Sequence, residues 1–199
     1  MAKKRMSTVT VLALALVFGC ERVPFAQQQT PNYKTTANWL ASQFPLIGGA
    51  ARGFGIGHST NHTIQYSFIS MGGCTLQFSE VDKADVGGTT LESEKITTSV
   101  PLWSVSEVVV APDTVFYENT YTVNIRTSMN AISKHEETYI SILSPELNGT
   151  VRDDHIRAAT LYLSRADVDG EALAPRIAAA LKNAVSFCKA QVPKSNEPF

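Results

Sequence analysis

The chain has 199 residues, of which 44% are hydrophobic and 18% are charged, and its formal net charge is −1. Beyond residue 19 it carries 14 basic and 18 acidic residues, so this part has a formal charge of −4. A mildly acidic chain without a cluster of lysine and arginine is a poor candidate for binding nucleic acid, or for binding anionic lipid through a basic patch.

The first twenty residues are typical of a secretory signal. A basic start at residues 3–5 precedes an uncharged apolar run over 9–18, which is too short for a membrane span of about 20 residues. The run ends in Val17-Phe18-Gly19-Cys20, which resembles the bacterial lipoprotein box, although Phe18 stands where a small or aliphatic residue is usual. This resemblance implies a signal peptide over 1–19 and a lipid on Cys20. The alternative is ordinary cleavage nearer Ala26.

A polar stretch and a short helix follow the signal. Residues 20–33 include the run Gln-Gln-Gln-Thr-Pro-Asn and are expected to form a tether. Thr35 or Thr36 could cap a helix in which Trp39 is expected to fill the core, and Pro45 ends that helix.

Residues 48–58 are rich in glycine and are expected to form a flexible linker. Alternating glycines can also mark a phosphate-binding loop, but such a loop must follow a strand and open a helix. Here a helix is expected before the segment and a strand after it, so the phosphate loop is excluded.

From His62 onward the apolar residues alternate with polar ones, which predicts strands. Gly72-Gly73 and the segment 85–90 are expected turns, and the first of these should close a hairpin. Seven strands are expected: 62–68, 74–78, 91–100, 107–111, 121–127, 137–143 and 158–164. The fourth could resume at 115–117. This pattern favours an antiparallel sheet that is buried on one face.

The last element is predicted to be a helix with one apolar stripe. Asp169 could cap this helix, and Pro175 lies either in its first turn or at a kink in a longer helix. The stripe recurs at spacings of three and four: Leu173, Ile177, Leu181, Ala184 and Cys188. The tail over 191–199 is expected to be flexible.

Cys74 and Cys188 are an even pair in a chain with a secretory signal, which predicts a disulfide. Cys188 lies on the apolar stripe and Cys74 is expected on an early strand beside Leu76, so a helix packed across the sheet would bring the two sulfurs together. In the chain-entropy model a bond closing so long a loop contributes roughly 4–5 kcal/mol. The alternative is two buried free cysteines, which behave as small apolar residues.

Two groups of residues are candidates for binding a metal, and both have a simpler interpretation. His58 and His62 are four apart, a spacing that joins two metal ligands on a helix, whereas these lie in a loop that runs into a strand. Asp153-Asp154-His155 could bind a cation, but 148–157 is expected to be a turn with exposed charge.

Two further motifs are incomplete. Asp167 and Asp169 lack the other acidic ligands of a calcium loop and are better explained as a helix N-terminus. Ser186 and Lys189 match Ser-x-x-Lys, but its companion motifs are absent from the sequence. We therefore expect no catalytic residue, no metal site and no cofactor.

The order of elements resembles a loose group of uncharacterised bacterial envelope domains over residues 34–190. These domains carry a Gly-Cys-x-Leu strand, here Gly73-Cys74-Thr75-Leu76, and a terminal helix that ends in cysteine, here with Arg176, Ala180, Ala184 and Cys188. The strand count also resembles a pleckstrin-homology-like barrel, in which seven antiparallel strands are capped by a C-terminal helix. Members that bind phosphoinositides use basic residues in the loop joining the first two expected strands, and 71–73 has none.

The sequence therefore predicts an α+β domain over 34–190, with an antiparallel sheet or barrel of about seven strands, a short N-terminal helix and a C-terminal capping helix. The expected function is a non-enzymatic binding module of the cell envelope, anchored to a membrane through a lipid and contacting another envelope protein. The alternatives are a soluble periplasmic or secreted carrier of a small apolar ligand, and a hydrolase with an unrecognised site.

Overall fold

A computed structural model describes residues 32–55, 58–113, 120–142, 145–164 and 167–191. The predicted signal peptide and Cys20 lie outside the described residues, as do all but the last two residues of the tether, all but the first residue of the tail, and the strand extension at 115–117. Among the described residues, neither helix is long and apolar enough to cross a membrane.

Nine strands form one sheet in the order β5-β6-β9-β1-β2-β3-β4-β7-β8, and two α-helices accompany it. Every pair of neighbours is antiparallel except β1 and β9. The elements are α1 (Tyr33–Gln43), β1 (Gly48–Gly55), β2 (His58–Gly72), β3 (Thr75–Val86), β4 (Thr89–Pro101), β5 (Val105–Asp113), β6 (Thr120–Thr127), β7 (Ile132–Ser141), β8 (Val151–Ile156), β9 (Ala158–Ser164) and α2 (Gly170–Gln191). The α+β class and both helices are confirmed, but the count of seven strands is wrong by two.

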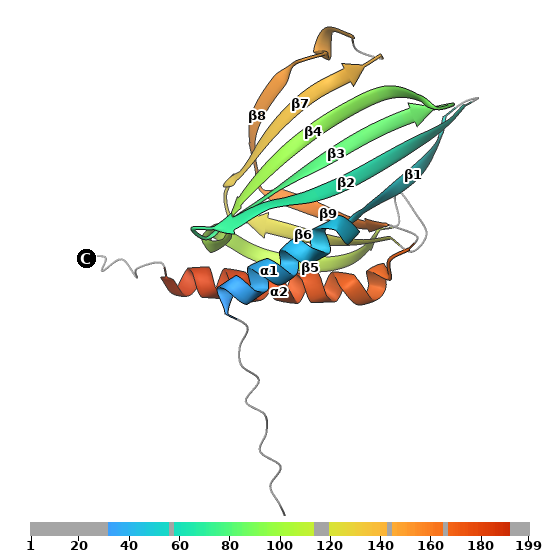
Figure 1. The fold of residues 1–199 in the computed structure, drawn as a ribbon. Helices are drawn as coiled ribbons and strands as arrows, with labels where there is room; N and C mark the ends of the chain where they lie inside the picture. Colours follow the sequence, from blue (N-terminus) through green and yellow to red (C-terminus); the bar gives the residue numbers. More distant parts are fainter. Residues whose placement is uncertain (1–31, 56–57, 114–119, 143–144, 165–166, 192–199) are drawn as a thin grey trace, which may run out of the picture. The chain divides into compact units, whose positions relative to one another are not determined.

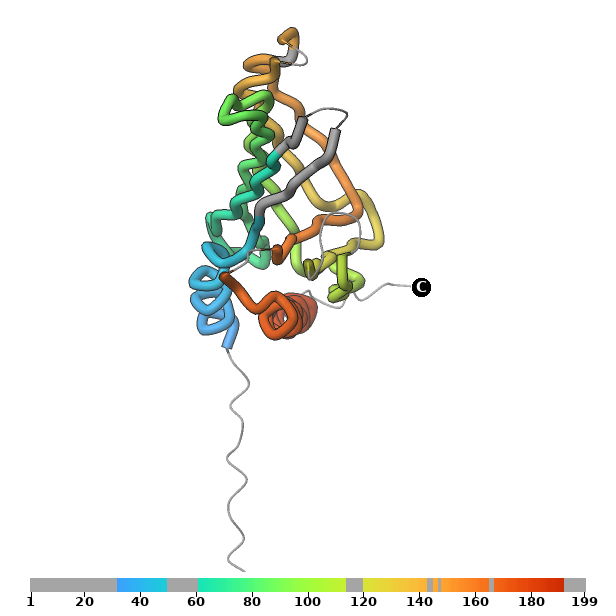
Figure 2. Tube along the Cα trace, turned by 90° about the vertical axis from the view of Figure 1, so that its right-hand side faces the viewer, coloured from blue at the N-terminus to red at the C-terminus, as the bar shows by residue number. Residues whose placement is uncertain are grey.

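The sheet curls into a half-barrel with the helices against one end. In Figure 1 strands β1–β4, β7 and β8 rise as one curved wall, while β5, β6 and β9 lie across its base against α2. Helix α1 packs on α2 and on β2. From the side, the two arms of the sheet face each other across a concave space (Figure 2).

A sharp corner produces this curl. It lies in a long hairpin of which one side is β6 followed by β7 and the other side is β8 followed by β9. Strands β6 and β7 pair with β9 and β8 respectively, and the pairing is interrupted where Thr127 N donates to Arg157 O at 2.8 Å. Residues 128–131 have no counterpart on the β8–β9 side of the hairpin, because Ile132 already pairs with Ile156. Arg157 Nε donates to Asn130 Oδ1 at 2.9 Å, and this hydrogen bond stabilises the corner. The extra residues bend both arms, as a large bulge does.

Strand β1 occupies the segment that was expected to be a linker. Its glycines permit a close approach of backbones: a Cβ at Gly49 would lie 1.5 Å from Ser164 Oγ, and one at Gly48 would lie 2.3 Å from Ile64 O. Glycine in a strand often marks such an approach. The glycine-rich composition therefore reflects packing against β2 and β9.

Strand β8 was also missed, because 148–157 was expected to be a turn. Its side chains are mostly charged, yet it pairs with β7 along its whole length. The structure gives it no second neighbour among the described residues, and charged side chains are common on such edges. The pairing partner β7 begins at Ile132, five residues before the predicted start at Glu137.

The two helices follow their predicted patterns with two corrections, at the cap of α1 and at Trp39. Asn32, and not Thr35 or Thr36, caps α1: its Oδ1 accepts from Thr35 N at 2.8 Å. Trp39 is only partly buried. Helix α2 begins at Gly170, with Asp169 Oδ1 accepting from Ala172 N at 3.0 Å as predicted, so Pro175 lies beyond the first turn.

The apolar stripe of α2 packs onto the base of the sheet. All five predicted stripe residues are buried, together with Leu40 and Phe44 from the N-terminal segment. Each fully buried aliphatic or aromatic side chain contributes about 1.5–3 kcal/mol, so this layer provides much of the driving force for folding.

The predicted Cys74–Cys188 disulfide is present, with its Cα atoms 5.6 Å apart, and it joins α2 to the β2–β3 hairpin. Cys74 lies in the turn of that hairpin and not on a strand. Gly73 and Cys74 have φ angles of +54° and +59°, as a tight hairpin turn requires. Cysteine adopts this conformation rarely, so the disulfide holds a residue type that is unusual in such a turn.

Candidate functional site

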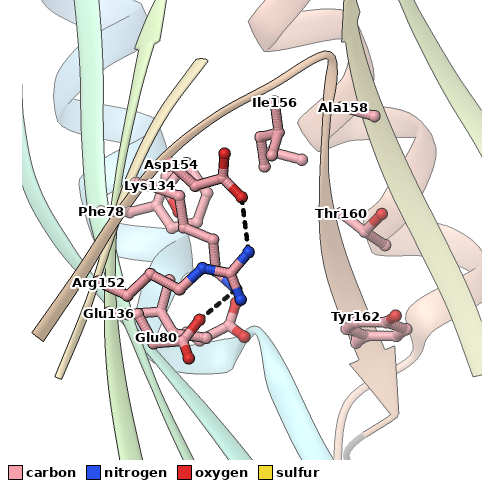
Figure 3. A pocket seen from close by; sticks show the side chains of 13 residues that line it. Phe78, Glu80, Lys134, Glu136, Arg152, Asp154, Ile156, Ala158, Thr160 and Tyr162 are labelled. Carbon is pink, nitrogen blue, oxygen red and sulfur yellow. Dashed lines mark hydrogen bonds and ion pairs between the residues drawn. The ribbon is translucent and has the colours of Figure 1, made fainter. Parts of the chain in front are cut away.

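A cavity of about 270 Å³ lies in the concave side of the half-barrel, between strands from both arms (Figure 3). One wall comes from β3, β4, β7 and β8, and the facing wall comes from β9 with Thr160 and Tyr162. The corner at Arg157 creates this space, because it turns β9 back toward the strands of the first arm.

The strand register sets charged side chains in rows on the concave face. Across β2, β3, β4, β7 and β8, one row reads Tyr66, Glu80, Ile96, Glu136 and Arg152. The next row toward the helices reads Phe68, Phe78, Thr98, Lys134 and Asp154. Both rows therefore carry charged side chains on β7 and β8, whereas on β2 and β3 the row nearer the helices is aromatic.

Four of these charges form two ion pairs along single strands. Lys134 Nζ lies 2.8 Å from Glu136 Oε2 on β7, and both side chains are largely buried. Arg152 lies 3.1 Å from Asp154 on β8, nearer to solvent. Figure 3 shows both pairs on the wall opposite Tyr162. Lys134 and Arg152 thus each neutralise one carboxylate of the cavity wall.

Glu80 is the remaining carboxylate of the cavity wall. Burial raises the pKa of Glu80, the charges of Asp82 and Glu94 raise it further, and Tyr66 and Lys134 only partly counter these effects. The Tyr66 hydroxyl also donates to Thr160 O at 3.2 Å, across the concave space to β9, and burial raises its own pKa well above the usual value. Glu80 therefore sits where its negative charge is poorly solvated and incompletely compensated.

Two more acidic side chains lie in the row beyond Glu80. Asp82 and Glu94 are opposite one another in the register, and burial raises the pKa of each. Asp82 Oδ1 is 3.8 Å from His62 Nδ1, which lowers the pKa of Asp82 against the effect of burial. The region therefore carries an excess of negative charge near the ring of Tyr162, an arrangement that attracts cations.

The structure separates the predicted Asp153-Asp154-His155 cluster, because neighbouring residues of a strand point to opposite faces. Asp154 lies on the concave face, whereas Asp153 lies outside and pairs with His135 at 2.7 Å. That hydrogen bond raises the pKa of His135. Within the described residues no group of three histidine, cysteine, aspartate or glutamate side chains could hold a metal ion.

A second depression, the β5–α2 groove, runs between strand β5 and helix α2 and has a volume of about 620 Å³. It contains Ser186 and Lys189 of the incomplete Ser-x-x-Lys motif, together with Lys182. Val108 and Val110 of β5 provide its apolar side. Among the described residues β5 pairs only with β6, so the groove follows a sheet edge.

Of the charged residues that line the cavity, sequence reasoning singled out only Asp154, and it did so as part of a cluster that the structure separates. The signal for Glu80 is its position in the alternating pattern of its strand. It follows Leu76 and Phe78 at a spacing of two, so it occupies the core-facing side. A charged residue in phase with an apolar face is rare, because burying a charge is costly unless it is paired. Arg152 could not be recognised in this way, because its strand was itself missed.

No family model matches this sequence, and comparisons with curated proteins and with solved structures found no similar protein.

Proposed function

We propose that this chain is an exported binding module of the cell envelope, anchored to a membrane by a lipid on Cys20, and that its concave cavity binds a small organic cation. The observation that carries the ligand class is Glu80, a partly buried carboxylate with a raised pKa that faces a cavity. The secretory signal and the disulfide support an oxidising compartment outside the cytoplasm.

A compact amine or guanidine fits the cavity better than an apolar ligand does. The volume lies near the lower end of the range for ligand pockets, which begins at about 300 Å³. A cation near Glu80 would offset its charge and those of Asp82 and Glu94, while Tyr162 on the facing wall offers a ring face. The charged lining makes the apolar carrier the weaker proposal.

Glu80→Gln is expected to weaken binding of agmatine or putrescine by about 10- to 100-fold, because a charge-assisted hydrogen bond contributes about 1.5–3 kcal/mol. Titration calorimetry with the wild-type and variant proteins measures this loss. Glu137→Gln is the matched control, since Glu137 pairs with His135 outside the cavity. Equal losses in both variants, or wild-type binding no tighter than that of a neutral diol, would contradict the proposal.

The pH dependence of binding gives an independent check. Because the pKa of Glu80 is raised, its charge is lost at a higher pH than that of an exposed glutamate, and affinity should fall as the pH is lowered through that pKa. The same raised pKa means that Glu80 lowers folding stability as the pH rises from its unfolded pKa to its folded pKa, and the full loss remains at higher pH. Glu80→Gln should therefore be at least as stable as the wild type at neutral pH, which separates lost binding from unfolding.

The anchor has its own prediction. Cys20→Ser is expected to move the protein from the membrane fraction to the soluble fraction, because acyl chains supply the membrane affinity. Fractionation of expressing bacteria, followed by intact mass of the mature chain, measures this. A wild-type chain that begins beyond Cys20 without acyl mass would make the protein a soluble exported one.

A second candidate function is binding of another envelope protein by strand addition at the β5–α2 groove. An extended segment could pair with the edge of β5 while its side chains enter the groove. Lys182 and Lys189 favour acidic side chains in that segment. This mode leaves the cavity free, so reversing the two lysine charges should not change cation binding.

We propose that the chain resembles pleckstrin-homology-like barrels in architecture alone. The shared features are a curled antiparallel sheet and a C-terminal helix. We also propose the relationship to envelope domains with a Gly-Cys-x-Leu motif and a terminal helix ending in cysteine. The motif residues Gly73 and Cys74 form the stapled turn, which gives that motif a physical reason.

A further inference from the structure

Three aromatic side chains gather around the disulfide and define what we call the aromatic patch: Tyr33, Trp103 and Phe187. Tyr33 and Phe187 are stacked, with ring centroids 4.9 Å apart. Trp103 is 49% exposed and Phe187 is 41% exposed, which is unusual for such large apolar residues. Together with Cys74 and Cys188 they line an open depression of about 460 Å³.

The helical layer that carries this patch is positively charged. Helices α1 and α2 contain four basic residues and one acidic residue, Glu171. All four basic side chains are exposed: Lys34, Arg176, Lys182 and Lys189. The rest of the chain beyond residue 19 has ten basic and seventeen acidic residues, so the charges are strongly segregated. No basic cluster is visible in the sequence because these four residues are spread over two helices that the fold places together.

The aromatic patch is also where the chain leads toward the proposed anchor. Tyr33 is the first residue of α1 and belongs to the patch itself. Cys20 precedes it by 13 positions, so the connecting chain spans at most about 45 Å even when fully extended. A lipid on Cys20 would therefore hold the start of α1, and Tyr33 of the patch, within this distance of the membrane surface.

We propose that the helical layer docks on a bilayer containing anionic lipid, with the aromatic patch at the level of the headgroups. This inference rests on the proposed lipid anchor. Tryptophan and tyrosine favour the membrane–water interface, and each basic residue near an anionic surface contributes about 1 kcal/mol. An anchored domain docked in this way would direct the open end of the half-barrel away from the membrane.

Tryptophan fluorescence tests this orientation, because the chain has two tryptophans in different settings. Trp103 lies in the patch, whereas Trp39 is partly buried on α1, with the Arg176 guanidinium 5.4 Å from its ring centroid. The mature protein, purified from membranes, is reconstituted into vesicles of phosphatidylethanolamine and phosphatidylglycerol with brominated acyl chains. Trp39→Phe isolates the emission of Trp103, and Trp103→Phe isolates that of Trp39.

Docking predicts that brominated lipid quenches Trp103 strongly and Trp39 weakly. Phe187→Glu should remove the quenching of Trp103, while Ile142→Glu should not, because Ile142 is similarly exposed but follows β7 at the end far from the helices (Figure 1). An acylated protein whose Trp103 is unquenched would overturn the docking alone. A mature chain without acyl mass on Cys20 would overturn the anchor and the docking argument with it.

Discussion

Replacing Cys188 with serine is expected to lower the free energy of unfolding by about 2–5 kcal/mol, the usual result of removing a native disulfide. The bond spans 114 positions of the chain, so its loss gives the unfolded state much additional freedom. It also releases the turn residue Cys74, whose φ of +59° most side chains avoid. For a domain of this size the melting temperature should fall by about 10 °C.

Thermal unfolding of matched variants measures this effect. Cys74→Ser should match Cys188→Ser, the double variant should be no less stable than either single one, and reductant should bring the wild type down to the same value. Additive losses would show that the two cysteines stabilise the fold separately, contrary to a single bond.

Gly48→Ala is expected to cost at least about 2 kcal/mol, because it combines a strained backbone with a steric clash. Gly48 has a φ of +121°, and an added Cβ would lie 2.3 Å from the backbone oxygen of Ile64. That oxygen belongs to β2 and cannot move without disturbing the β1–β2 pairing. Chemical denaturation reports the loss as a lower midpoint.

Gly88→Ala is the matched control for this substitution. Gly88 also has a positive φ, of +83°, but no atom lies within 4 Å of the position of its Cβ. It should lose only the roughly 1–2 kcal/mol that the left-handed conformation costs an alanine. Equal losses at the two positions would mean that the close packing of β1 contributes nothing to stability.

The parts of the fold that could be predicted are those in which side-chain periodicity records burial directly. Helix α2 and the β2–β3 hairpin have such patterns, and the structure confirms both. Strand β1 could not be found in this way, because its glycines have no side chains to alternate. What makes it a strand is its contact with β2 and with Ser164 of β9, a residue far along the chain.

The cavity was unpredictable for a related reason. Glu80, Glu136 and Arg152 of its wall come from three strands, β3, β7 and β8, which are aligned by pairing across the sheet. Glu80 alone carries a local signal, because it is in phase with Leu76 and Phe78, whereas Glu136 and Arg152 carry none. Only the pairing register shows that they share one face, and the register follows from the whole sheet.

The disulfide also determines when the fold can be completed on a chain that is made from its N-terminus. Synthesis proceeds at about 5–20 residues per second, so the thiol of Cys74 waits roughly 6–23 s before Cys188 exists. The β2–β3 and β3–β4 hairpins join neighbouring segments and can form during this interval, whereas the contact of β1 with β9 must also wait. Once the chain reaches the oxidising compartment proposed for it, a thiol at the hairpin tip that has not met its partner is open to mixed disulfides, so the yield of native protein should depend on how quickly thiol–disulfide exchange corrects them.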